Sequence, residues 1–263
     1  MGTLNLKSTF TEIRDSRNVL KALVIKNLIG KYRNSALGFG WHFIMPIILL
    51  CTYYTVFTQI RSIPIPDFWI YLASGLFPFN FMINNLSNGS SCIVGNAGMI
   101  KKMYFPREII VLSQVISTFI IMLIGYTIIL IATIISGHGL GLSIIALPIM
   151  FILTFIFTLG YVFLFSAITV YFRDFQHFIT STSMIFFFMT PMYFLFDSIT
   201  GIFRLVVSLN PLTYFIESFH EIMYYHTFPS LLNISLSIVI STLSLSIGLL
   251  VFHTLKTGFV ERL

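Results

Sequence analysis

The densest group of ionisable side chains in the sequence is Glu217-Ser-Phe-His220-Glu221. On a helix, Glu217 and Glu221 would share one face, and carboxylates beside an imidazole are possible ligands for Zn²⁺. The metalloprotease pattern H-E-x-x-H fails, because Tyr224 stands where the second histidine would be. Helix capping and contacts with lipid headgroups account better for this group. An intramembrane enzyme that acts on lipid carriers around Glu217 and Glu221 remains an alternative.

The chain carries no nucleotide-hydrolysis motif. The phosphate-binding pattern G-x-x-x-x-G-K-[ST] does not occur, and the glycine cluster Gly137–Gly141 predicts a turn. Proton- and sodium-driven transporters usually place ionisable residues at mid-membrane, but the long apolar stretches contain no Asp, Glu, Lys or Arg. We therefore expect no catalytic residue, metal or cofactor on this chain, and a driving force supplied from elsewhere.

The composition indicates an integral membrane protein. Of 263 residues, 57% are hydrophobic and 9% are charged, against about 25% charged in a soluble domain. A disordered chain, a fibrous repeat and a water-soluble enzyme are excluded. Stretches without charged residues predict an all-α membrane protein with six transmembrane helices, at about 40–60, 68–87, 109–135, 144–171, 177–197 and 231–252.

The basic residues predict the orientation of these spans. With six spans both termini share one side, and that side carries all of the 15 basic residues except Arg61 and Arg204. Because cytosolic loops are enriched in Lys and Arg, both termini are expected in the cytosol, with the chain in the cytoplasmic (inner) membrane. The positive charge suits anionic membrane lipids, and no nucleic-acid partner is expected.

Two segments are neither spans nor ordinary loops. Within the cytosolic segment 1–35, apolar residues recur at helical spacing, so 11–35 predicts an amphipathic helix on the membrane surface, as an anchor or a docking element. The outer segment 198–230 stays apolar, which predicts re-entrant helices between spans five and six. Residues 36–263 then form one transmembrane domain, with a cytosolic loop at about 88–108.

Six motifs follow one another along nearly the whole chain. They are Lys31-Tyr-Arg-Asn-Ser-Ala-Leu-Gly-Phe-Gly-Trp41 with Pro46, Tyr71-Leu-Ala-Ser-Gly-Leu-Phe-Pro-Phe79, the stretch from Asn96 to Phe105-Pro106-Arg107, Phe172-Arg173-Asp174, Thr190-Pro191, and Asn210-Pro211-Leu212. Together they resemble the permease subunits of type-2 ABC transporters, most closely the group that exports O-antigen, capsule and teichoic acid. At position 79 this chain has Phe, where many members of this family have Trp.

The resemblance implies a partner and a cargo. Two copies of the permease, a homodimer, would export a lipid-linked polysaccharide, powered by two copies of a separate ABC ATPase that binds ATP and Mg²⁺. The first cytosolic loop would hold a coupling helix that contacts this ATPase through Asn96, Gly98, Lys101, Lys102, Phe105 and Arg107. The alternatives are a small-molecule or drug exporter of the same superfamily and a passive scaffold, which the long loop disfavours.

The resemblance also implies a route for the cargo. At the cytosolic entrance, Arg33 and Arg173 are candidates to pair with the diphosphate of a lipid-linked glycan. Sugars stack their C–H faces on aromatic rings, and the family passes polymer through an aromatic-lined channel. The candidates for this lining are Tyr53, Tyr54, Phe57, Phe77, Phe79, Tyr161, Phe165 and Tyr193.

Overall fold

The computed structural model describes residues 6–30, 37–59 and 65–263, and this part of the chain is all-helical, as predicted. The α-helices are α1 (Leu6–Asp15), α2 (Arg17–Gly30), α3 (Trp41–Gln59), α4 (Phe68–Asn84), α5 (Cys92–Gly95), α6 (Ala97–Lys102), α7 (Glu108–Ile135), α8 (Leu147–Tyr171), α9 (Phe175–Met189), α10 (Gly201–Leu209), α11 (Pro211–Met223), α12 (Leu231–Leu255) and α13 (Phe259–Arg262). A π-helix, η2 (Asn85–Gly89), follows α4, and short 3₁₀ turns are η1 (Gly38–Gly40), η3 (Leu142–Ala146), η4 (Phe196–Ser198) and η5 (Lys256–Gly258).

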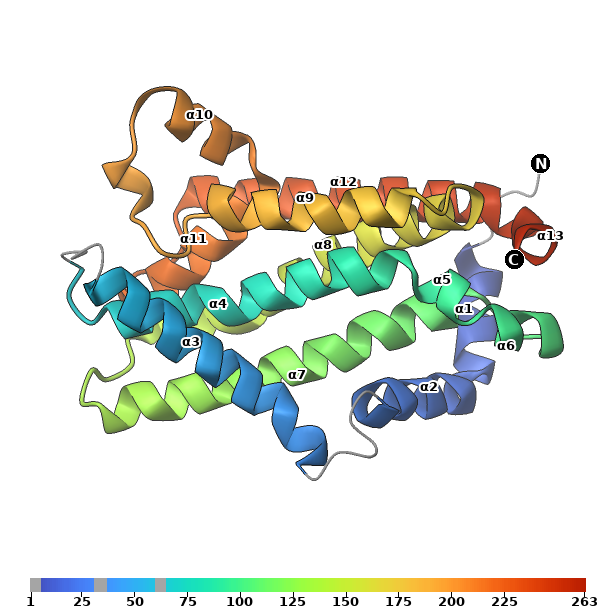
Figure 1. The fold of residues 1–263 in the computed structure, drawn as a ribbon, viewed down its shortest axis with the longest axis horizontal. Helices are drawn as coiled ribbons and strands as arrows, with labels where there is room; N and C mark the ends of the chain where they lie inside the picture. Colours follow the sequence, from blue (N-terminus) through green and yellow to red (C-terminus); the bar gives the residue numbers. More distant parts are fainter. Residues whose placement is uncertain (1–5, 31–36, 60–64) are drawn as a thin grey trace.

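The long helices run along the long axis of the molecule (Figure 1), with α3 crossing the others obliquely. The short helices α1, α6 and α13 lie at one end, at the right of the view, while α10, α11 and the turn between α7 and α8 lie at the other. The connections between α7 and α8 and between α8 and α9 are short, whereas α5 and α6 lie between α4 and α7, and α10 and α11 lie between α9 and α12. Segments distant in sequence therefore meet at each end of the bundle.

Three segments of the described chain are long and apolar enough to cross a membrane: Glu108–Ile135, Leu142–Tyr171 and Leu231–Arg262. The helices α3, α4 and α9 are shorter, so the six-span topology remains a prediction. The fifth predicted span, 177–197, corresponds to a helix that ends at Met189. The reason is Pro191, which disfavours helical backbone in the preceding residue, and Thr190 is indeed extended, with φ −103° and ψ 131°.

Helices α8 and α12 make the most extensive contact of any helix pair in the described part of the chain. Ser241 Oγ donates to the Leu153 carbonyl at 2.9 Å, and Ser244 Oγ donates to the Phe157 carbonyl at 3.0 Å. At Gly160 of α8, which has no side chain, the backbone of α8 is in direct contact with the backbone of α12 at Ser244. Small residues allow such close approach, which maximises van der Waals contact where no hydrophobic driving force exists between helices.

The predicted amphipathic helix at 11–35 is two helices in the structure, α1 and α2, which meet at Ser16. Leu23 of α2 is buried, and the Asn27 side chain amide donates to Ser113 Oγ of α7 at 3.4 Å. Helix α2 thus packs on the first turns of α7. Residues 31–36, which include Arg33, lie outside the described residues.

Candidate functional site

The predicted coupling segment begins where α4 passes through the π-helix η2 into α5 and α6. Asn96, between α5 and α6, donates its side chain amide to the Cys92 carbonyl at 2.8 Å. Its Oδ1 accepts a hydrogen bond from Lys26 Nζ of α2 at 3.0 Å. The segment is therefore tied to the N-terminal helices, a contact that sequence spacing did not reveal because Lys26 lies 70 residues earlier.

The rest of this segment forms a surface that mixes charge and apolar groups. Lys101 and Lys102 are exposed, and Gly98 has open space around it. Phe105 and Arg107 are half-buried. They border a groove of about 680 Å³ whose wall also includes Glu12 and Asp15 of α1. Basic and acidic side chains at one end of the bundle are suited to steer and orient a soluble partner.

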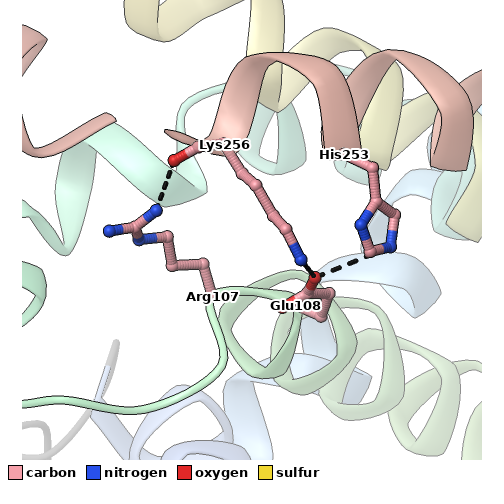
Figure 2. Close-up of polar contacts among 4 residues, drawn as sticks. All are labelled: Arg107, Glu108, His253 and Lys256. Carbon is pink, nitrogen blue, oxygen red and sulfur yellow. Dashed lines mark hydrogen bonds and ion pairs between the residues drawn. The ribbon is translucent and has the colours of Figure 1, made fainter. Parts of the chain in front are cut away.

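The segment ends in a polar cluster that joins α7 to α12 (Figure 2). Glu108 is 3% exposed, and its Oε1 accepts from Lys256 Nζ at 2.7 Å. The same oxygen lies 3.8 Å from His253 Nε2. Arg107 donates to the backbone carbonyl of Lys256. Of these residues, only Arg107 was predicted from the sequence. Glu108 could have been found from the sequence, because it is a charged residue at the first position of an apolar helix.

Two of the predicted channel aromatics line an apolar groove between α4, α8 and α9. The groove has a volume of about 350 Å³, and Tyr161 and Phe165 of α8 contribute to its wall. The Tyr161 hydroxyl donates to the Met82 carbonyl of α4 at 2.5 Å, which fixes its ring across the groove. Sequence reasoning missed the other rings of this wall: Phe157, Phe175, Phe178 and Phe186.

Four more of the predicted aromatics gather around the α9 side of the bundle. Tyr53, Phe79 and Tyr193 lie around Phe187, with ring centroids 5.4, 5.9 and 5.6 Å from it. Phe57 stacks on Tyr193 with 4.7 Å between centroids. Helices α3, α4 and α9 are thus joined by a single aromatic cluster, and its central ring, Phe187, was not predicted.

The remaining predicted residues have different surroundings. Phe77 packs against α7, where it occupies the space that a side chain at Gly125 would fill. Tyr54 is exposed and stacks near Phe68 with 6.4 Å between ring centroids. Arg173 is exposed in the short link between α8 and α9. The roles suggested for these residues remain predictions.

Three of the sequence motifs meet near the N-terminus of α4, at the end away from the coupling segment. The rings of Tyr71 and His220 stack with 3.8 Å between centroids. His220 Nε2 lies 3.0 Å from the Pro191 carbonyl and Nδ1 lies 2.9 Å from Ser74 Oγ. Because a carbonyl can only accept, Nε2 carries the proton toward Pro191. The Ser74 hydroxyl beside Nδ1 also donates to the Tyr71 carbonyl at 2.8 Å. Gly75 leaves room for the imidazole, since a Cβ there would lie 2.9 Å from His220 Cε1.

Asn210 completes this network at the start of α11. Its amide nitrogen donates to Thr190 Oγ1 at 2.9 Å and to the Met189 carbonyl at 3.1 Å. Its Oδ1 accepts from the Leu212 backbone N–H at 3.0 Å and so caps α11. The motifs at 71–79, 190–191 and 210–212 therefore build one junction between α4, α9 and α11.

Of the two glutamates on α11, Glu221 has a structural role. Its Oε2 accepts from the Ser230 backbone N–H at 3.0 Å and from Asn233 Nδ2 at 3.1 Å, at the N-terminus of α12. The capping interpretation therefore holds for Glu221, and both ring nitrogens of His220 are engaged. Among the described residues, no group of three or more His, Cys, Asp or Glu side chains is arranged to hold a metal ion.

The chain is similar to known proteins over most of its length. Residues 18–224 match the family described as ABC-2 type transporter. A relative from Klebsiella pneumoniae, the O-antigen export system permease protein RfbA, is 30% identical over 250 residues, which cover 94% of this chain and 95% of that protein. The protein of the same name from Myxococcus xanthus is 26% identical over 254 residues, which cover 96% of this chain and 98% of that protein. The resemblance predicted from the motifs is thus confirmed: the chain belongs to the ABC-2 type transporter family.

Proposed function

We propose that this chain is the permease subunit of an ABC exporter that moves a lipid-linked polysaccharide from the cytosol to the outer face of the membrane. The cargo would be an O-antigen-like chain, a capsule or a teichoic acid. The observation that carries the proposal is the alignment, over nearly the full length of both chains, with permeases named for O-antigen export.

The proposed topology has six spans, α3, α4, α7, α8, α9 and α12, with both termini in the cytosol. Helices α1 and α2 would lie at the cytosolic surface, and α10 and α11 would re-enter the membrane from outside. In support, α10 and α11 lie at the end of the bundle opposite α1, α6 and α13 (Figure 1). Buried apolar residues on α11, including Phe215, Ile216 and Phe219, favour a position within the protein.

A separate ATPase subunit would bind ATP and Mg²⁺ and dock on the segment from Asn96 to Arg107, with two copies of each subunit in the complete transporter. The exposed lysines of α6 and the adjoining groove of about 680 Å³ support this assignment, because they present charge at one end of the bundle. Rim charges of this kind mainly affect association rate and orientation.

The proposed route for the polymer follows the two aromatic groups. The groove with Tyr161 and Phe165 and the partly exposed rings of the cluster around Phe187 offer flat apolar faces on which sugar rings can stack. Arg173, exposed in the α8–α9 link, would pair with the lipid diphosphate, as would Arg33, which lies outside the described residues.

Depletion of the protein tests this proposal. Glycan would be measured in the cytosol and on the cell surface after depletion. Polymer trapped inside on its lipid carrier, with a matching loss from the surface, is the expected result. Normal surface glycan with nothing trapped would instead favour the small-molecule exporter.

A further inference from the structure

Two neighbouring residues at the end of the predicted coupling segment hold the same lysine of α12. Arg107 donates to the backbone carbonyl of Lys256, the residue that caps the C-terminus of α12. Glu108 accepts from the ammonium group of Lys256 at 2.7 Å. Both the backbone and the side chain of Lys256 are therefore fixed from the α7 side (Figure 2).

This contact is more specific than simple packing requires. The Glu108 side chain is only 4% exposed and that of Lys256 is 28% exposed, so the ion pair must offset the cost of desolvating a buried carboxylate. An apolar pair of similar volume would hold two helices together at least as well. What the charged pair adds is a defined geometry. His253 lies on the same face of α12, with its Nε2 3.8 Å from Glu108 Oε1, which is beyond hydrogen-bond distance.

Helix α12 connects this cluster to the wall of the apolar groove. Gly248 of α12 is in direct backbone contact with Gly160 of α8, so no side chain can yield between the two helices. The next residue on α8 is Tyr161, which lines the groove. A displacement of α12 along or across this contact must therefore displace α8 or break the contact.

We infer that Arg107, Glu108 and Lys256 are positioning residues that transmit movement of the coupling segment to α12 and, through α8, to the groove. The inference rests on the proposed function, since it assigns the link to the transport cycle of that exporter. With the link intact, a shift of the segment that the ATPase contacts moves the groove wall. Without it, the ATPase turns over while the wall stays in place.

The test uses the complete permease–ATPase complex and a double-mutant cycle that removes the charges of Glu108 and Lys256. Cells that lack the gene receive the wild-type gene, Glu108→Gln, Lys256→Met or the double variant. Permease in the membrane, ATP hydrolysis by the purified complex in lipid discs and surface polysaccharide are measured. Lys256→Met leaves the buried Glu108 carboxylate unpaired and should accumulate poorly, whereas Glu108→Gln leaves only the partly exposed Lys256 ammonium unpaired and should cost less. The double variant should recover its membrane level and ATP hydrolysis, but its export should stay about tenfold below wild type.

Recovery of export together with membrane level in the double variant would overturn the inference, because the pair would then only stabilise the fold. Arg107→Met gives an independent measure, since it removes the donor to the Lys256 carbonyl without unpairing the buried carboxylate. It should lower polymer exported per ATP, and no change would likewise overturn the inference.

Glu261→Gln, an exposed charge removal at the same end of the bundle, is the matched control and should export normally. The wild-type arm tests the proposed function separately. If the wild-type gene does not restore surface polysaccharide, the cargo assignment fails before any variant is compared.

Discussion

Gly160 of α8 and Gly248 of α12 are in direct backbone contact: a Cβ placed on Gly248 would lie 2.0 Å from the Gly160 carbonyl oxygen. No real side chain tolerates that distance, so any residue other than glycine must push the helices apart. Hydrogen bonds from Ser241 and Ser244 to α8 carbonyls lie on the N-terminal side of the contact in both helices and fix its register. Any relative movement of helices α8 and α12 must therefore break these contacts.

Gly248→Ala should destabilise the protein. The added methyl group meets backbone atoms, which cannot rotate away, so the cost should be in the overpacking range of about 1–3 kcal/mol. Thermal unfolding of the purified protein in detergent would report this as a lower Tm. Gly30→Ala is the matched control, because a Cβ at Gly30 meets nothing within 4 Å. Equal Tm values for the two variants would contradict the close contact.

Asn210→Ser should separate helix capping from the junction with α9. Serine keeps an oxygen that caps α11, but it lacks the amide that donates to Thr190 Oγ1 and the Met189 carbonyl. Because Asn210 is buried, the lost hydrogen bonds should lower the free energy of unfolding by about 1–3 kcal/mol. Ser208→Ala, which removes only a bond within α10, is the control for this unfolding measurement. A smaller loss for Asn210→Ser than for Ser208→Ala would argue against the junction.

The positions of the long helices could be predicted because charged residues and turns bound their apolar runs. The predicted spans 109–135 and 231–252 correspond closely to Glu108–Ile135 and Leu231–Leu255. Hydropathy failed at the end of α9, where apolar residues continue past Met189 although the backbone leaves the helix. Pro191 carried the signal for that end, but a count of apolar residues does not weigh backbone geometry.

The candidate site was less accessible from sequence, because its contacts join distant segments. Glu108 and Lys256 lie 148 positions apart, and neither belongs to a motif that names the other. Phe187 is one of three consecutive phenylalanines, and only the rotation of α9 shows that its ring meets Tyr53, Phe79 and Tyr193. Residue types could suggest that aromatic rings line a channel. Which rings belong to that lining depends on which face of each helix points inward.

Glu221→Gln should be tolerated, because the remaining amide oxygen can still accept from the Ser230 backbone N–H. Glu221→Ala removes the acceptor and should cost about 1 kcal/mol, as loss of an N-terminal cap does. Surface polysaccharide and thermal stability would be measured for both variants. An enzyme that used this carboxylate would lose turnover in Glu221→Gln as fully as in Glu221→Ala, so equal and severe loss would revive the enzymatic alternative.

Phe165→Leu should reduce export per molecule in the membrane, beyond any loss of stability from its ring contacts with Tyr161 and Phe175. Leucine keeps the apolar character of the groove wall but removes the flat ring, and each aromatic stacking contact is worth about 1 kcal/mol, or roughly fivefold in rate. Phe151→Leu, on the same helix, is the control. Its ring packs against Tyr126 and Phe219, so this change should lower Tm rather than export per molecule. Unchanged export in Phe165→Leu would remove this ring from the proposed route.

Lys101→Glu should weaken association with the ATPase subunit. Lys101 is exposed at the end of α6, so reversing its charge should slow association and change its salt dependence without unfolding the permease. Binding of the purified ATPase to the permease in lipid discs would be followed at low and high salt. Arg204→Glu makes the same charge change on exposed α10 at the opposite end of the bundle and is the control. If both variants bind the ATPase like wild type at low salt, α6 is not the docking surface. If only Lys101→Glu is impaired and salt removes the difference, the charge on α6 steers the docking.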